Sequence, residues 1–82
     1  MNRVVPQEEL DEFVHGWAMR LAEGPPLALQ MTKRMVNSGL QMSLSEMLHW
    51  EGMAQTVNGA TEDGKEAMMA FMEKRPPKFQ GR

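Results

Sequence analysis

The sequence predicts an all-α fold, a small bundle of about four helices with a short extended segment at the N-terminus. Apolar residues recur at spacings of three and four in four separate stretches, which is the period of an amphipathic helix. Prolines, glycines and capping residues separate these stretches and mark where each helix starts and stops. The chain has 82 residues, so the helices belong to one small domain at most.

The first helix should run from about Pro6 to Glu23. Pro6 suits the first turn because its missing N–H would have no partner there. Acidic residues follow it, where the positive end of the helix dipole stabilises negative charge. Gly24 stops the helix, and the two prolines after it prevent continuation. The expected apolar face consists of Leu10, Phe13, Val14, Trp17 and Leu21.

The second helix should open at Pro25-Pro26 and end at Asn37-Ser38-Gly39. Its expected stripe is Ala28, Met31, Thr32 and Met35, with Leu29 and Val36 beside it.

The third helix should start at Ser43. Ser43 with Glu46 three residues later forms the pattern of a capping box. Asn58-Gly59 fits a left-handed C-terminal stop. The expected apolar face is Leu44, Met47, Leu48 and Ala54, widened by Trp50, Met53 and Val57.

The fourth helix should be capped by Thr61, with Glu62 and Asp63 as favourable charge in its first turn. We expect Pro76-Pro77 to terminate it and residues 76–82 to be extended. Its expected stripe is Met68, Phe71 and Met72, with Lys74 and Arg75 at the negative end of the helix dipole.

Asn2–Val5 does not fit a helix. Val4 and Val5 favour a strand, but no other strand is expected in this chain. The segment therefore either lies against the helices or pairs with something outside this sequence.

Composition excludes several classes of protein. The net charge is −2 and Lys and Arg are scattered, so there is no basic stripe for nucleic acid. No apolar run approaches the roughly 20 residues of a membrane span, and the N-terminus lacks the apolar core of a secretory signal. Cysteine is absent and the two histidines are far apart, so we expect no disulfide and no metal site. We expect a cytoplasmic protein.

The ten methionines fit helical core packing. The alternative is an apolar surface that binds an acyl chain or another subunit. A domain of this size buries only about 60% of its unfolded surface, so we expect self-association to add stability.

We expect no catalytic residue. The serines, Ser38, Ser43 and Ser45, are explained as loop or cap residues. His15 is expected on a helix surface, and His49 at the surface or an interface. Glu51 falls on the apolar side of the third helix, where it could pair across an interface.

Short motifs follow one another along almost the whole chain. In order they are Asn2-Arg3-Val4-Val5-Pro6, Glu9-Leu10, Trp17-Ala18-x-x-Leu21-Ala22, Pro26-Leu27-Ala28-Leu29, Thr32-Lys33-Arg34, Val36-Asn37, Ser43-Leu44-x-Glu46, Glu51-x-x-x-Gln55, Glu62-Asp63, Glu66-Ala67, Ala70-Phe71-x-Glu73-Lys74-Arg75 and Pro77-x-Phe79. Together they resemble the C-terminal third of the enoyl-CoA hydratase/isomerase (crotonase) family. Ala67 stands where the family often has glycine, and Gln55 where hydratases often have an aromatic.

This resemblance implies that residues 1–82 are a C-terminal helical region for lid and oligomer contacts, without the catalytic β-β-α core. The oxyanion hole and acid-base carboxylates of the parent, a lyase or isomerase of fatty acid metabolism, would lie in that missing core. The chain alone is therefore expected to be inactive and to carry no cofactor, while the parent would bind a coenzyme A thioester. By resemblance, Phe71 and Lys74 lie near the CoA moiety. The competing interpretations are core packing for Phe71 and helix-end stabilisation for Lys74.

The expected partners are the missing N-terminal core and further copies of the chain, in a dimer or trimer. The alternative is a free-standing helical interaction module whose Met-rich faces bind a partner helix or self-associate. Coding sequence upstream of Met1 would distinguish the two. A membrane-surface helix is disfavoured because no Lys/Arg-rich polar face is present.

Overall fold

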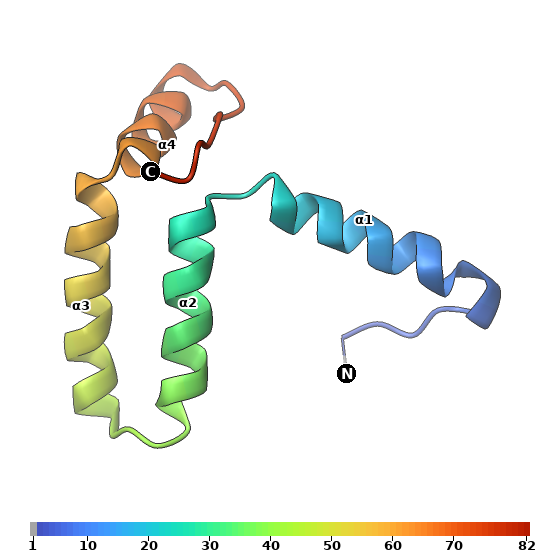
Figure 1. Cartoon of the computed structure of the whole chain (residues 1–82), viewed down its shortest axis with the longest axis horizontal. Helices are drawn as coiled ribbons and strands as arrows, with labels where there is room; N and C mark the ends of the chain where they lie inside the picture. The colour runs from blue at the N-terminus through green and yellow to red at the C-terminus, as the bar shows by residue number, and fades with distance from the viewer. Residues whose placement is uncertain (1) are drawn as a thin grey trace.

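The structure, a computed structural model, describes residues 2–82, and this part of the chain forms four α-helices and no strand. A short 3-10 helix, η1, precedes the first of them. The elements are η1 (Gln7–Glu9), α1 (Leu10–Ala22), α2 (Pro26–Gly39), α3 (Leu44–Ala60) and α4 (Glu62–Glu73) (Figure 1). The predicted all-α class is confirmed.

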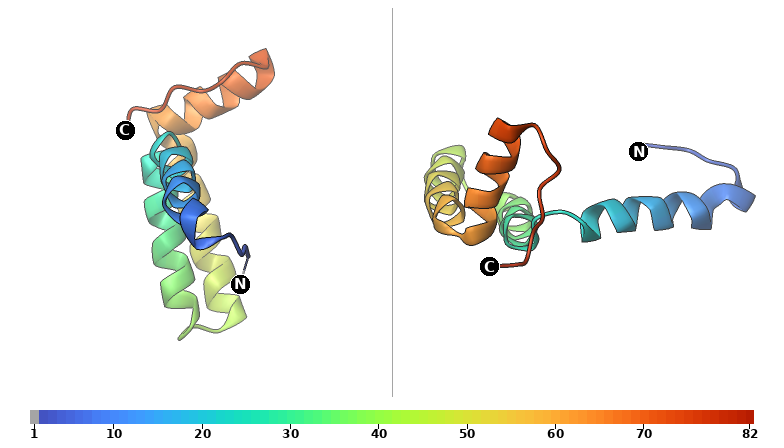
Figure 2. Two further views of the ribbon diagram at one scale, coloured as in Figure 1. Left: turned by 90° about the vertical axis from the view of Figure 1, so that its right-hand side faces the viewer. Right: turned by 90° about the horizontal axis from the view of Figure 1, so that it is seen from above.

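The helices form an open arrangement. α2 and α3 lie side by side as a hairpin, α4 crosses one end of it, and α1 extends away (Figures 1 and 2). The radius of gyration is 15.9 Å, against about 12 Å for a compact chain of this length. The accessible surface is 7246 Å², whereas a compact monomer of this mass exposes roughly 5,000 Å². Large helix faces are therefore left uncovered by the described residues.

The N-terminal segment runs back alongside α1 and contacts it through Arg3. This contact does not select between the two expected placements, because Val4 stays 83% exposed. The Arg3 guanidinium stands over the Phe13 ring, 5.8 Å from its centroid, and the Phe13 and Trp17 rings are 5.5 Å apart. A hollow of about 570 Å³ separates the segment from the helix. Most of the predicted apolar face of α1 remains exposed, for example Leu21 at 60%.

The predicted helix start at Pro6 is wrong. Pro6 has an extended backbone, with φ −56° and ψ 149°. Its carbonyl accepts a hydrogen bond from the Glu9 N–H at 3.0 Å, which closes a 3-10 turn before α1 begins at Leu10.

The capping box of α3 is confirmed. The Ser43 Oγ accepts a hydrogen bond from the Glu46 N–H at 3.2 Å, and the Glu46 carboxylate accepts one from the Ser43 N–H at 2.8 Å. α2 ends at Gly39 as predicted. On α3, Met47 and Ala54 are half-buried, but Leu44 and Leu48 are exposed, so that side of the predicted face is wrong.

The predicted stop at Asn58-Gly59 is also wrong, because α3 continues to Ala60 and neither residue has a positive φ. Thr61 ends the helix instead, with an extended backbone at φ −72° and ψ 160°. Its hydroxyl donates to the Asn58 carbonyl at 2.6 Å and accepts from the Gly64 N–H at 2.9 Å. The corner is so tight that a Cβ on Gly64 would lie 2.2 Å from the Asn58 carbonyl oxygen. Thr61 therefore terminates α3 and also caps α4. The cap of α4 was predicted, whereas the end of α3 at Thr61 was not.

α4 ends at Glu73, three residues before the first proline, which corrects the prediction that Pro76-Pro77 terminates it. Lys74 adopts the left-handed conformation, with φ 55° and ψ 41°. Its N–H donates to the Phe71 carbonyl at 3.3 Å, and the Arg75 N–H donates to the Ala70 carbonyl at 3.0 Å. This pair of bonds is a Schellman motif. The tail, residues 76–82, is extended as predicted and folds back along α4.

Candidate functional site

The apolar side of α4 is open. Its predicted core stripe is exposed, at 68% for Met68, 86% for Phe71 and 70% for Met72. We call these three residues the open face of α4. Burial occurs on the opposite side, at Asp63 and Ala70. The predicted burial of this stripe is therefore wrong within residues 2–82, and core packing inside the described chain does not explain Phe71.

Lys74 follows the open face at the end of the helix. Its left-handed backbone is uncommon for a residue with a side chain. The ion pairs found within residues 2–82 do not include its ammonium group. The end of α4 thus presents an exposed aromatic ring followed by an exposed cation.

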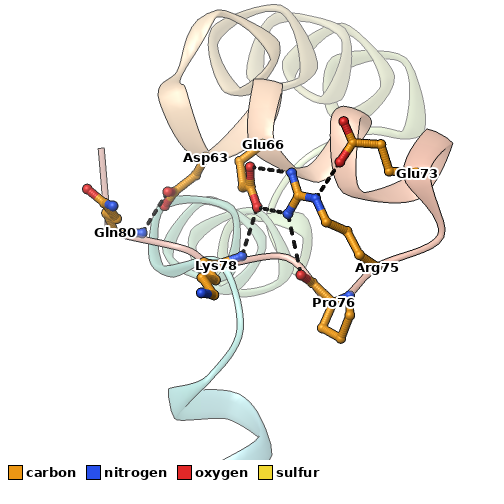
Figure 3. A network of polar contacts seen from close by, with 7 residues as sticks. All are labelled: Asp63, Glu66, Glu73, Arg75, Pro76, Lys78 and Gln80. Atoms are coloured by element: carbon orange, nitrogen blue, oxygen red, sulfur yellow. Dashed lines mark hydrogen bonds and ion pairs between the residues drawn. The ribbon is translucent and has the colours of Figure 1, made fainter.

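The neighbouring Arg75 is fully engaged. Its guanidinium binds both oxygens of Glu66, at 2.5 and 3.1 Å, and its Nε donates to Glu73 at 2.6 Å (Figure 3). Glu66 also accepts the Lys78 N–H at 3.0 Å. Hydrogen bonds from Arg75, then from Lys78, lower the pKa of Glu66 to about 2. Its carboxylate raises the pKa of Arg75 above its usual range. Sequence reasoning had named Glu66 only within the motif Glu66-Ala67 and had assigned it no ion pair.

Asp63 binds the far end of the tail. Its side chain is buried, and its two oxygens accept the Gln80 N–H at 2.7 Å and the Gly81 N–H at 2.8 Å. Its own N–H donates to the Arg82 carbonyl at 2.8 Å. The interpretation of Asp63 as simple helix-start charge is therefore incomplete. Its partners lie 17 and 18 residues away, and no local pattern marks such contacts.

A second hollow, of about 480 Å³, lies between α2 and α3. Five of the ten methionines line it, together with Trp50, Ala54 and Val57. We call it the methionine groove, and its methionines are Met31, Met35, Met42, Met47 and Met53. These methionines border an open surface, which agrees better with a contact or acyl-binding surface than with a sealed core.

The other residues considered for chemistry are dispersed. His15, His49 and Glu51 are exposed on α1 and α3. Ser43 is engaged in the capping box described above. Across residues 2–82, no three His, Cys, Asp or Glu side chains gather as a metal site would need. Over the same residues, no helix has the length and apolar character that crossing a membrane requires.

Comparison with known proteins gives a consistent family. A family model described as enoyl-CoA hydratase/isomerase matches residues 1–82. The 2,3-dehydroadipyl-CoA hydratase of Escherichia coli K12 is 35% identical over 82 residues, which is 100% of this chain and 32% of that protein. The methylmalonyl-CoA decarboxylase of the same organism is 37% identical over 84 residues, 99% of this chain and 32% of that protein.

The similarity extends to three dimensions. The crystal structure of an enoyl-CoA hydratase subunit I from Geobacillus kaustophilus HTA426 superposes with a TM-score of 0.91 at 45% identity, over 100% of this chain and 32% of that one. The chain spans 29% to 32% of the length of the curated relatives it matches.

Proposed function

The chain belongs to the enoyl-CoA hydratase/isomerase family, and on that premise we propose that it is the C-terminal helical region of an acyl-CoA enzyme. In this role it covers the acyl-CoA site and makes subunit contacts. The observation that carries the proposal is the open face of α4, which ends beside Lys74 and has no cover within residues 2–82. The alternative, a free-standing interaction module, is not favoured because the family model matches residues 1–82.

The N-terminal segment supports the C-terminal placement. Val4 is 83% exposed on an extended, strand-favouring segment that precedes the helices. A segment of this kind suits the end of a strand whose partners belong to a preceding β-rich core. That core would supply the oxyanion hole and the acid-base carboxylates.

Phe71 and Lys74 are the residues we propose to lie against coenzyme A. An exposed aromatic ring can stack on the adenine base, and an ammonium group can meet a phosphate. The Phe71 ring is 86% exposed, and Lys74 has no ion-pair partner within residues 2–82 that would compete for its charge.

The reaction of the whole protein would be set by the β-rich catalytic core that we propose precedes this chain. Two relatives are named a hydratase and a decarboxylase of CoA thioesters, so the family alone does not specify the reaction. We propose a cytoplasmic role in acyl-CoA and fatty acid metabolism, with a coenzyme A thioester as substrate and no separate cofactor. The 82-residue chain alone should not hydrate crotonyl-CoA, and hydration by the purified chain would contradict the proposal.

The CoA contact is tested in the protein that joins this chain to its acyl-CoA core. Phe71→Ala should raise KM for a CoA thioester, because base stacking on an aromatic is worth about 1–3 kcal/mol. Lys74→Ala should raise KM by up to about fivefold, since an exposed ion pair contributes about 1 kcal/mol at most.

Lys65→Ala is the matched control, because Lys65 is also exposed on α4 but lies in its first turns. It should leave KM unchanged. Equal KM values for Phe71→Ala, Lys74→Ala and Lys65→Ala would show that Phe71 and Lys74 do not contact coenzyme A.

A further inference from the structure

The tail is held on α4 by carboxylates that bind its main-chain N–H groups. Asp63 binds Gln80, and Glu66 binds Lys78 nearer the turn at Lys74 and Arg75 (Figure 3). Asp63 also binds the Gly81 N–H. Asp63 takes part in no ion pair within residues 2–82, although its side chain is only 3% exposed. A buried carboxylate is costly unless its oxygens are satisfied, and here the tail satisfies both of them.

The end of the tail also reaches α2. Gly81 has a φ of 79°, and a Cβ placed on it would lie 3.7 Å from the Cγ of Pro26. Pro26 is the first residue of α2. Residues 80–82 therefore lie between the first turn of α4 and the start of α2, two elements that are separated in sequence by all of α3.

We propose that Asp63 is a positioning residue, and that through it the tail acts as a strap fixing α4 against the start of α2. The corner at Thr61 joins α4 to α3 by one short connection, which alone leaves the direction of α4 open to hinge motion. The strap adds a second attachment and defines that direction. It thereby sets where the open face and Lys74 lie. The link to coenzyme A rests on the proposed function, whereas the strap itself does not.

Asp63→Asn tests the strap with little change in shape. The amide replaces one acceptor oxygen by an NH₂ group, which would face a main-chain N–H donor. Glu62→Gln is the matched control, because Glu62 is the adjacent carboxylate in the same helical turn. Glu62 meets the tail only through an ion pair with the Arg82 side chain; both side chains are 68% exposed, and such exposed pairs contribute little. Both variants remove one negative charge near the N-terminus of α4.

The chain has no cysteine, so two introduced cysteines give each copy two spin labels, and dilution with unlabelled chain keeps the measured distances within one copy. Pulsed electron spin resonance on labels at Gln30→Cys and Lys65→Cys reports the α2–α4 distance. Labels at Gln30→Cys and Gln55→Cys report the α2–α3 hairpin and serve as the folding control. These sites are exposed.

With Asp63→Asn, we expect the α2–α4 distance distribution to become at least about twice as wide, while the α2–α3 distribution stays unchanged. Exchange of the Gln80 and Gly81 amide protons should become about tenfold faster. Glu62→Gln should change neither. An α2–α4 distribution that is the same in Asp63→Asn and the parent chain would overturn the strap. If α4 moves as expected but Phe71→Ala leaves KM unchanged, the strap stands and the CoA contact fails.

Discussion

The surroundings of Glu66 give this molecule a pH dependence. Its carboxylate accepts hydrogen bonds from Arg75 and from the Lys78 N–H, and its pKa falls from 4.5 to about 2. A carboxyl group with a lowered pKa stabilises the folded state fully above its unfolded pKa, and this stabilisation is lost as pH falls through the folded pKa. We therefore expect the turn at Arg75 and the start of the tail to loosen between about pH 4.5 and 2. The Lys78 amide resonance, followed by NMR over this range, should report the change.

Glu66→Gln provides the comparison for this titration. The Lys78 amide should lose its titration in the variant, because no carboxylate remains beside it. The Ser43 amide should still titrate, since a hydrogen bond from Ser43 also lowers the pKa of Glu46, which is unchanged. A Lys78 resonance that titrates identically in both proteins would show that another group causes the change.

At the scale of elements, Thr61 is the residue on which two helices depend. Thr61→Ala removes the hydroxyl group, which accepts the Gly64 N–H and donates to the Asn58 carbonyl, and we expect a loss of about 1–2 kcal/mol in the stability of α4. Thr61→Ser keeps the hydroxyl and should retain most of that stability. Amide exchange at Gly64 and Lys65 measures the difference. Similar exchange rates in the Ala and Ser variants would mean that the hydroxyl does not hold the corner.

The accuracy of the sequence predictions follows the range of the interactions involved. The capping box at Ser43 and the cap at Thr61 were predicted because each is made within three residues. The buried side of α4 was not, because contacts with Gln80 and Gly81 select it, and hydrophobic periodicity pointed to the opposite side. The stop at Asn58-Gly59 failed for a different reason, which is local. Thr61 supplies a stronger local terminator two residues later, so no left-handed residue is needed.

For the candidate site too, the features set by local sequence were predicted and those set by distant contacts were not. Phe71 and Lys74 were selected from the motif Ala-Phe-x-Glu-Lys-Arg, and both are exposed at the end of α4. The left-handed backbone of Lys74 was not foreseen, because glycine usually occupies such a position. Asp63 and Glu66 were not assigned to the tail, because their roles appear only when distant main-chain N–H groups reach them.

At the scale of the whole molecule, the exposed apolar faces predict self-association. The chain exposes 7246 Å², roughly 2,000 Å² more than a compact monomer of its mass. Contiguous apolar patches of several hundred Å² promote association. We expect a dimer or trimer at tens of micromolar, on the order of a working concentration, and sedimentation equilibrium measures it. A monomer under these conditions would contradict the prediction.

The open face of α4 can be tested for its share in this association. Met68→Gln combined with Met72→Gln should weaken the association, because it replaces apolar surface with polar amides. Leu40→Gln is the control, since Leu40 is 89% exposed but lies just after α2, at the end of the hairpin opposite α4 (Figure 1). If the two proteins associate equally, another face makes the contact.

The methionine groove has a chemical consequence. Thioether sulfurs on an accessible surface are oxidised by peroxide to sulfoxides, which are polar. Five such side chains border one hollow of about 480 Å³, so oxidation would change its walls from apolar to polar. Any neighbour seated on the groove would shield those sulfurs. The rate at which each methionine gains an oxygen atom, followed by mass spectrometry, would then indicate when this surface is occupied and which part of it is covered.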